Sequence, residues 1–410
     1  MTAATAMEAE DRRFLASFIL LSVVSGLTVG LGKIVTTLYA ISLQATPFQI
    51  GVISAMESLG MVLVTVPAGF IIARYGARWV YFLSSLGPML IYLALPFSAS
   101  WLTLASARWS IGLCIPFRMI AMNSSFLERV PRFGASKAGW YRASLTGGMA
   151  IVGPILATVL STRASIETIF FTVAALFAVM AAFSLSFMPQ RDPEASREGA
   201  SLIAEVQLLI ANPRVGESCF VEFVNSATNA LFATFIIVLA ASITGLTEQD
   251  GIRVMLLQGS AVVALLFFGG SLFARLSTAA GYGFSAACAA LALLSFAFAP
   301  DFGTRGFALL GLGAVLLALG SAAVHLINVR MLVALPGGKS KVAGLFNLAS
   351  MTGSSFGALA GGALTKVVPL SSVFLIWLPF LVLSGATIQL LHRRRTALDS
   401  PIASPLAQET

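Results

Sequence analysis

Long uninterrupted stretches of apolar residues dominate this sequence. Each holds about 20 residues or more, the length at which an α-helix crosses roughly 30 Å of hydrocarbon. A transmembrane β-barrel would instead alternate apolar and polar residues, and a chain with 58% hydrophobic and 10% charged residues is too apolar for a water-soluble domain. The pattern predicts an all-α polytopic membrane protein with twelve spans, near residues 14–43, 48–73, 78–97, 101–128, 137–161, 167–188, 215–243, 250–274, 277–299, 306–333, 341–365 and 370–391.

Basic residues are sorted to one side of these spans. Lys and Arg stay on the cytoplasmic side of inserted segments, and a cytoplasmic N-terminus leaves just Arg163, Arg253, Arg305 and Lys366 on the opposite side. We therefore expect a multi-pass protein of the inner (plasma) membrane with both termini cytoplasmic. The same sorting accounts for the formal net charge of +8, so the charge gives no reason to expect nucleic acid as a partner.

The second half of the chain repeats features of the first. Gly69 and Arg74, at the end of the second span, recur as Gly270 and Arg275 about 200 residues later. Two membrane halves related in this way usually enclose a site between them. A polar stretch separates the halves, so we expect an N-terminal six-helix bundle over 1–189, a cytoplasmic linker with a candidate interfacial helix over 190–213, a C-terminal six-helix bundle over 214–395 and a disordered cytoplasmic tail over 396–410.

The loop after the second span carries a motif. Residues 69–78 read GFIIARYGAR, which resembles the Gly-x-Leu-Ala-Asp-Arg-x-Gly-Arg-Lys loop of the major facilitator superfamily of secondary transporters. Gly69, Arg74, Gly76 and Arg78 match, whereas Ala73 stands where the family has an acid. The resemblance covers nearly the whole chain and implies two pseudo-symmetric six-helix bundles that work by alternating access. It also implies that this loop is a conformational gate, whose lock on the outward-facing state is weakened by the missing acid.

A second candidate for the gate lies in the fifth span. Gly153 and Pro154 keep the centre of a pattern, Gly-x-x-x-Gly-Pro-x-x-Gly-Gly, that is found in exporters of the family. Small residues let helices approach closely, and proline removes a backbone donor and permits a kink. Close packing alone explains the same residues, so they support export only weakly.

Polar residues within the spans indicate where a solute would bind. The resemblance places spans 1, 4, 7 and 10 around a central cavity, and charged groups in hydrocarbon usually face a cavity or a partner. Glu222, Asn225 and Asn229 share one helical face because of their spacing. Hydrogen bonds that only join the helices are the alternative role. The candidate substrate-binding residues are Lys33, Arg108, Arg118, Asn225, Asn229, His325 and Asn328.

Two acids are candidates for proton coupling, Glu57 and Glu222. Lys33 and Glu57 lie about twelve residues on either side of the turn near Pro47, so both sit roughly 18 Å below the outer surface and can form a pair. Arg108 reaches a similar, shallower depth and can join them. A carboxylate between water and apolar protein can bind and release a proton, whereas a structural ion pair is the alternative role for Glu57.

The sequence lacks the motifs of a metal site, of nucleotide binding and of enzymatic catalysis. His325 has no second histidine or acid at metal-ligand spacing, and the sequence lacks the Gly-x-x-x-x-Gly-Lys-Ser/Thr loop that binds nucleotides. No nucleophile with a partner base is apparent, so we expect neither an enzyme nor a bound metal or cofactor. An ion gradient would then supply the energy.

We therefore expect a secondary active transporter of a small organic solute, coupled to protons and monomeric in the lipid bilayer. The intramembrane bases Lys33, Arg108 and Arg118 outnumber the acids Glu57 and Glu222, which favours an anionic or zwitterionic solute.

Two other functions fit the sequence. A drug-type exporter of lipophilic compounds is favoured by the abundant Phe and Met residues. A transporter-like protein that carries nothing, and acts as a sensor or scaffold, is favoured by Ala73.

The residue at position 73 gives the first prediction. If the family's acid locks the outward-facing state, Ala73→Asp should shift the resting population outward, and about 1.4 kcal/mol would change the ratio tenfold. Cysteine labelling from each side of the membrane, in a background without Cys114, Cys219 and Cys288, measures this shift. Unchanged accessibility would show that the loop no longer sets the equilibrium.

Overall fold

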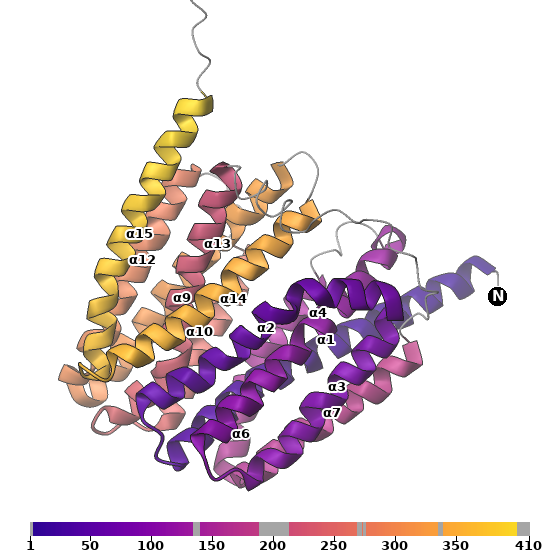
Figure 1. The fold of residues 1–410 in the computed structure, drawn as a ribbon, viewed down its shortest axis with the longest axis horizontal. Helices are drawn as coiled ribbons and strands as arrows, with labels where there is room; N and C mark the ends of the chain where they lie inside the picture. Colours follow the sequence, from indigo (N-terminus) through magenta and orange to yellow (C-terminus); the bar gives the residue numbers. More distant parts are fainter. Residues whose placement is uncertain are drawn as a thin grey trace, which may run out of the picture.

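The computed structural model describes residues 3–133, 140–187, 213–268, 273, 276–334 and 339–399, which fold almost entirely into helices (Figure 1). The first half forms α1 (Ala3–Ser42), α2 (Pro47–Tyr75), α3 (Ala77–Ala94), η1 (Leu95–Phe97), α4 (Trp101–Phe133), α5 (Trp140–Gly147), the π-helix η3 (Gly148–Val152), α6 (Gly153–Arg163) and α7 (Ile166–Phe187). The second half forms α9 (Pro213–Ser242), α10 (Glu248–Phe268), α12 (Thr278–Phe298), η4 (Ala299–Arg305), α13 (Gly306–Ala334), α14 (Lys339–Leu364) and α15 (Leu370–Asp399).

Each of the twelve predicted spans falls on these helices, and α5, η3 and α6 together form the fifth. Within the described residues, nine helical stretches are long and apolar enough to cross a membrane, and one of them, Thr278–Asn328, contains all of α12 and most of α13. The predicted all-α membrane fold is confirmed. The predicted linker lies outside the described residues, except that Pro213 begins α9. At the other end of the chain, α15 continues to Asp399, past the predicted start of the tail, and the rest of the tail lies outside the described residues.

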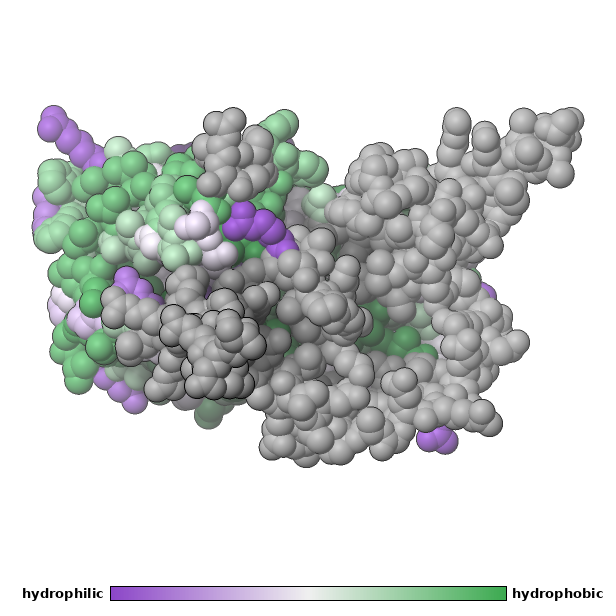
Figure 2. Space-filling view, turned by 90° about the horizontal axis from the view of Figure 1, so that it is seen from above, coloured by the Kyte–Doolittle hydropathy of each residue, from purple (hydrophilic) through white to green (hydrophobic). Residues whose placement is uncertain are grey.

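The outer surface of the bundle is apolar. Phe268 is 83% exposed and Leu83 is 62% exposed. Figure 2 shows the C-terminal half at the left, where hydrophobic residues predominate over scattered hydrophilic ones in the coloured surface. Water would drive such a surface to associate, whereas the acyl chains of a bilayer solvate it.

Local sequence signals set the first hairpins. Thr46 caps α2 by accepting a hydrogen bond from the backbone N–H of Gln49, whose side chain accepts in return from the backbone N–H of Thr46. At the other end of α2, Gly76 has a φ of 80° and its N–H donates to the carbonyl of Ile72. Only glycine adopts this backbone conformation without strain, so the glycine of the matched motif makes the turn into α3.

Glycines let the helices within each half touch backbone to backbone. A Cβ atom on Gly26 of α1 would lie 2.0 Å from the carbonyl oxygen of Leu145 on α5, and one on Gly357 of α14 would lie 2.0 Å from that of Ala227 on α9. Small residues drive helix association in membranes because they permit such close van der Waals packing.

The two halves meet near the loops at one end of the molecule and diverge toward the end that carries the first turn of α1 and the last turn of α15 (Figure 1). Gly51 of α2 packs against α14, where a Cβ on residue 51 would lie 2.9 Å from the Cα of Gly362. The ammonium group of Lys366 lies 3.6 Å from the ring centre of Phe48. Close packing and a cation–π contact therefore join the two halves at this end.

The glycine contacts predict position-dependent effects on stability. Gly26→Ala should lower the melting temperature in detergent, because the new methyl group meets backbone, and overpacking typically costs about 1–3 kcal/mol. Gly283→Ala on α12 is the matched control, since no heavy atom lies within 4 Å of a Cβ placed there. Equal melting temperatures for the two variants would contradict the α1–α5 packing.

Candidate functional site

A cavity of about 350 Å³ lies between the two halves. Helices α1, α2, α4 and α5 line it from the N-terminal half, and α9, α10, α13 and α14 line it from the C-terminal half. Five of the predicted substrate-binding residues face this space, and so does the predicted proton-coupling residue Glu222. The five are Lys33, Arg108, Asn225, Asn229 and His325.

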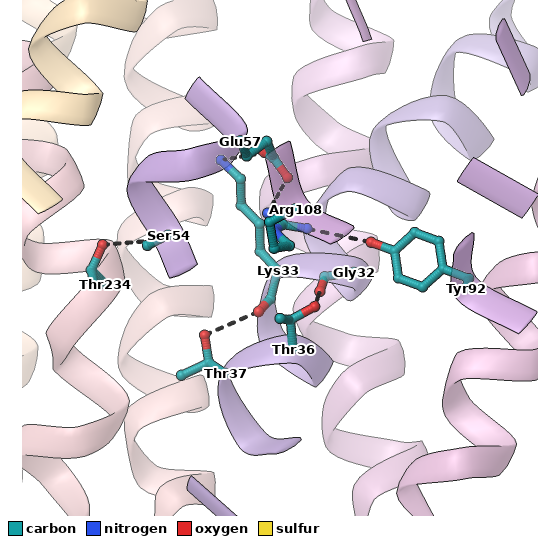
Figure 3. A network of polar contacts seen from close by, with 9 residues as sticks. All are labelled: Gly32, Lys33, Thr36, Thr37, Ser54, Glu57, Tyr92, Arg108 and Thr234. Atoms are coloured by element: carbon teal, nitrogen blue, oxygen red, sulfur yellow. Dashed lines mark hydrogen bonds and ion pairs between the residues drawn. The ribbon is translucent and has the colours of Figure 1, made fainter. Parts of the chain in front are cut away.

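Three charged residues form one group on the wall of the N-terminal half (Figure 3). An Arg108 Nη2–Glu57 Oε2 contact forms the tighter ion pair, and Lys33 Nζ lies 3.6 Å from Glu57 Oε1. Arg108 also donates through Nη1 to Tyr92 Oη at 3.4 Å. The predicted pairing of Lys33 with Glu57, joined by Arg108, is confirmed.

Glycines bring this charged group together. A Cβ on Gly112 of α4 would lie 2.2 Å from the carbonyl oxygen of Glu57, so glycine there lets α4 touch α2 beside the acid. A Cβ on Gly32 of α1 would lie 2.1 Å from Tyr92 Oη, so glycine there leaves room for the tyrosine that Arg108 contacts. The charged group thus depends on the backbone as much as on its own side chains.

Burial distinguishes the members of this group. The side chains of Glu57 and Arg108 are 2% and 4% exposed, whereas that of Lys33 is 45% exposed. Arg108 therefore directs its charge to Glu57, and Lys33 is the more accessible of the two cations on this wall.

Glu222 stands on the opposite wall, on α9. Its Oε2 accepts a hydrogen bond from Asn328 Nδ2 at 3.0 Å, and its Oε1 accepts one from Ser226 Oγ at 3.4 Å. Asn328 Oδ1 in turn accepts from Tyr282 Oη at 2.9 Å, which fixes the orientation of the amide. Asn328 is 3% exposed and does not line the cavity. The structure therefore corrects the prediction for Asn328, which supports Glu222 from behind instead of facing the solute.

Amide side chains continue this wall. Asn229 Nδ2 donates to Asn225 Oδ1 at 3.1 Å, and Asn229 Oδ1 accepts from Gln258 Nε2 at 3.2 Å. Asn225 Nδ2 donates to Ser321 Oγ at 3.3 Å. The predicted shared face of Asn225 and Asn229 is present, and its amides join α9 to α10 and α13 as well as lining the cavity.

Arg118 lies elsewhere. Its Nη2 donates to Ser25 Oγ at 2.9 Å, and its guanidinium carbon lies 4.6 Å from the ring centre of Phe177 and 5.8 Å from that of Tyr81. It is 2% exposed and absent from the cavity lining. The ten-residue spacing from Arg108 rotates the two side chains roughly 80° apart around α4, which turns Arg118 into the N-terminal half. The structure therefore corrects the prediction that Arg118 binds the solute.

Sequence reasoning missed one buried acid. Glu217 on α9 is 0% exposed and lies less than two turns from Glu222. The signal that could have found it was a second carboxylate in the seventh predicted span, at the margin of the apolar run.

The candidate gate residues lie near the turn between α2 and α3 or directly after the π-helix η3. Arg74 is exposed, with its guanidinium carbon 5.5 Å from the ring centre of Tyr75. Gly153 and Pro154 begin α6 directly after the π-helix η3, and the N–H of Gly153 donates to the carbonyl of Gly148. A π-turn before a proline is a place where a helix bends. The surroundings of Gly69 lie outside the described residues, while Arg78 is half-buried at the start of α3.

The family model of the major facilitator superfamily matches residues 14–324. The chain belongs to this superfamily of secondary transporters. It is a multi-pass membrane transporter for small molecules and not an enzyme. No curated protein sequence matches the chain.

Solved transporter structures share the fold at low sequence identity. The nucleoside transporter NupG is 13% identical with a TM-score of 0.76, covering 93% of this chain and 99% of that one. A POT family transporter in complex with 5-aminolevulinic acid is 12% identical with a TM-score of 0.77, covering 93% and 96%. A bacterial homologue of the human lysosomal transporter Spinster, in an inward-facing and occupied conformation, is 14% identical with a TM-score of 0.73, covering 92% and 96%. At these identities the likeness shows the fold alone.

The charged group predicts unequal roles for its two cations. Glu57→Gln strands Arg108 in the protein interior, and breaking one side of a buried pair typically costs about 3–5 kcal/mol. Adding Arg108→Met should recover most of the lost thermal stability, whereas adding Lys33→Met should recover little, because Lys33 is half exposed. Melting temperatures of the purified variants measure this. Equal rescue by both second substitutions would contradict the dominance of the Glu57–Arg108 pair.

Proposed function

We propose that this protein transports a small anionic or zwitterionic organic solute through the central cavity by alternating access, coupled to protons. One observation carries the proposal. Lys33 exposes a positive charge to the cavity, while its acidic neighbour Glu57 is buried and already paired with Arg108. A cation in that position attracts a carboxylate or another small anion.

The proposed orientation places both termini in the cytoplasm of a cell with the protein in its inner (plasma) membrane. The sorting of basic residues supports it. With this orientation, the end where Gly51 packs against α14 is the outer end, and the halves diverge toward the cytoplasm (Figure 1). The structure then corresponds to an inward-facing state of a monomer.

Glu222 is the proposed site of proton exchange. It faces the cavity, and its hydrogen bonds from Asn328 and Ser226 come from neutral groups. A proton on Glu57 would instead remove the negative charge that lies between Lys33 and Arg108. Because the two cations are held by that charge, we assign a structural role to Glu57 and the coupling role to Glu222.

The apolar part of the lining favours a second candidate. Ile34, Ile53, Met255 and Leu266 face the same cavity. These side chains would accept the body of a lipophilic compound, as in a drug-type exporter. For such cargo the charge at Lys33 would be dispensable.

Uptake into proteoliposomes tests the transport of a charged solute. Suitable candidate solutes are nucleosides, 5-aminolevulinic acid and small carboxylates. The first two are named for two transporters of similar fold. All three classes can be screened by ligand-induced thermal stabilisation before uptake is measured. Wild type should accumulate the solute and Lys33→Met should lose at least about tenfold of the rate, while Lys33→Arg keeps part of it. Two results together would favour the drug-type exporter: wild type takes up no anion or zwitterion, and Lys33→Met still takes up a lipophilic cation.

Proton coupling gives a separate prediction. Glu222→Gln should abolish the response of uptake to an imposed pH gradient but keep solute exchange at equal pH, because exchange needs binding and rocking without a net proton movement. Glu167→Gln, at the first turn of α7, is the control and should behave like wild type. A normal pH-gradient response in Glu222→Gln would move the coupling site elsewhere.

A further inference from the structure

We propose that Ser321 determines which solutes the cavity accepts, because its hydroxyl group donates a hydrogen bond to a carbonyl oxygen of the cargo. Short oxo acids are then preferred over plain carboxylates. The proposal rests on the transport function proposed above and narrows its class of solute. It follows from the direction of the hydrogen bonds in the amide wall.

One backbone carbonyl fixes that direction. Asn229 Nδ2 donates to the backbone carbonyl of Asn225 at 2.9 Å. A carbonyl can only accept, so the side-chain atom beside it is the amide nitrogen of Asn229. The other amide atom, Oδ1, therefore faces Gln258, whose Nε2 donates to it at 3.2 Å.

The same assignment orients Asn225. Its Oδ1 accepts from Asn229 Nδ2 at 3.1 Å, which turns its own Nδ2 toward Ser321 Oγ at 3.3 Å. Ser321 Oγ also accepts from Asn229 Nδ2 at 3.4 Å. An amide nitrogen donates and does not accept, so both contacts leave the hydroxyl proton of Ser321 for another group.

That proton has no acceptor among the described residues. Helical serines often donate to a carbonyl of the preceding turn, as Ser22 does to Phe18 and Ser85 does to Tyr81. In the described part of the chain, Ser321 makes contacts in which it accepts and none in which it donates. An unsatisfied donor inside a protein is costly, and Ser321 lines the cavity. A solute that brings an acceptor to this position removes the cost.

The contact between Ser54 and Thr234 relates the depths of the two cavity walls. Both residues line the cavity, and their hydroxyl oxygens lie 3.0 Å apart (Figure 3). At about 1.5 Å per residue, Glu57 lies about 4.5 Å from this contact along α2 and Asn229 about 7.5 Å along α9, both away from the end where the halves join. The two levels therefore differ by about 3 Å, less than one helical turn.

Lys33 and Ser321 belong to these two levels. Lys33 Nζ lies 3.6 Å from Glu57 Oε1, and Ser321 Oγ lies 3.4 Å from Asn229 Nδ2. The walls converge directly beyond, at the Ser54 contact, so a carboxylate at Lys33 and a carbonyl oxygen at Ser321 occupy neighbouring parts of one cavity. A methylene group beside Ser321 leaves the hydroxyl unsatisfied, whereas a carbonyl oxygen accepts from it.

A smaller space of about 40 Å³ lies behind the amide wall, among α9, α12, α13 and α15, and Ser321 borders it as well. A hydroxyl directed into that space would donate to a water molecule instead of the solute. Matched ligands distinguish these two directions, because only a donor that faces the cavity discriminates between them.

Matched acids test the contact on the purified full-length protein. The oxo acids 4-oxopentanoate, 5-oxohexanoate and 6-oxoheptanoate are each compared with the plain acid of the same chain length. Thermal stabilisation over a range of ligand concentrations gives the affinities. At least one oxo acid should bind about tenfold more tightly than its plain partner, the size expected for a hydrogen bond to an otherwise unsatisfied group.

Variants assign the preference to Ser321. Ser321→Ala should bind the two acids of a pair equally, and Ser321→Thr, which keeps the hydroxyl group, should retain the preference. Lys33→Met should weaken both acids and leave their ratio unchanged. Ser295→Ala, on α12 and outside the cavity lining, is the matched control and should bind as wild type does.

Asn229→Asp tests the direction of the chain while Ser321 stays in place. The new carboxylate only accepts, so Asn225 is expected to turn its Nδ2 toward position 229 and its Oδ1 toward Ser321. The hydroxyl proton of Ser321 then donates to Asn225. The added negative charge should weaken both acids of a pair, and the preference for the oxo acid should disappear.

Three outcomes would overturn this contact alone. Equal binding of oxo and plain acids by wild type would show that no donor meets the carbonyl oxygen, and the proposed anion transport would stand. A preference that persists in Ser321→Ala would assign the contact to another residue. Binding of none of these acids, by a protein that takes up another anion into proteoliposomes, would exclude this class of solute. Failure of every anion in the uptake assay would overturn the proposed transport function as well.

Discussion

The ion pair between Glu57 and Arg108 is the interaction on which the arrangement of the cavity depends. Both side chains are withdrawn from solvent, and a buried pair is tolerable only where the geometry is close and the remaining polar atoms find partners. Gly112 provides the close geometry by letting α4 touch α2, and Tyr92 adds a hydrogen-bond partner for Arg108. Glu57 Oε1 is buried without a hydrogen bond, and the charge of Lys33 Nζ lies 3.6 Å from it. Because Glu57 is held by Arg108, Lys33 is left facing the cavity with a weaker hold on the acid.

The two halves share a fold but not their charges. Glu57 of α2 forms ion pairs in the first half, whereas Gln258 of α10 in the second half donates a hydrogen bond to Asn229. Glu222, which lines the cavity from the C-terminal half, lies on α9 and accepts hydrogen bonds from Asn328 and Ser226. The described charged residues therefore differ between the two walls of the cavity. This difference is a property of the present chain and does not follow from the fold alone.

Features that depend on helical rise and apolar length could be read from the sequence. The spans were predictable because a membrane fixes the length of a helix, and the depth of Lys33 and Glu57 followed from their equal distances from one turn. Features that depend on the rotation of a helix against its neighbours could not be predicted from the sequence. Arg118 and Arg108 are equivalent in the sequence pattern, but the rotation of α4 turns Arg118 toward Phe177. Asn328 shares the polar pattern of α13, but its amide is directed toward Tyr282 and Glu222.

The contacts between the halves include neutral hydrogen bonds and close glycine packing. Across the halves, Thr234 Oγ1 donates to Ser54 Oγ at 3.0 Å (Figure 3), and a Cβ on Gly259 would lie 2.3 Å from the carbonyl oxygen of Ala150 in the π-helix. A neutral hydrogen bond has a net value of only about 0.5–1.5 kcal/mol, so such contacts can separate and reform.

The costly pair, Glu57 with Arg108, joins α2 to α4 within one half. Rocking of the two halves as rigid bodies leaves that pair intact, because both of its members move together. The Glu57–Arg108 pair can therefore stay in place while the weak contacts between the halves break and reform. Alternating access requires this combination of rigid halves and separable contacts between them.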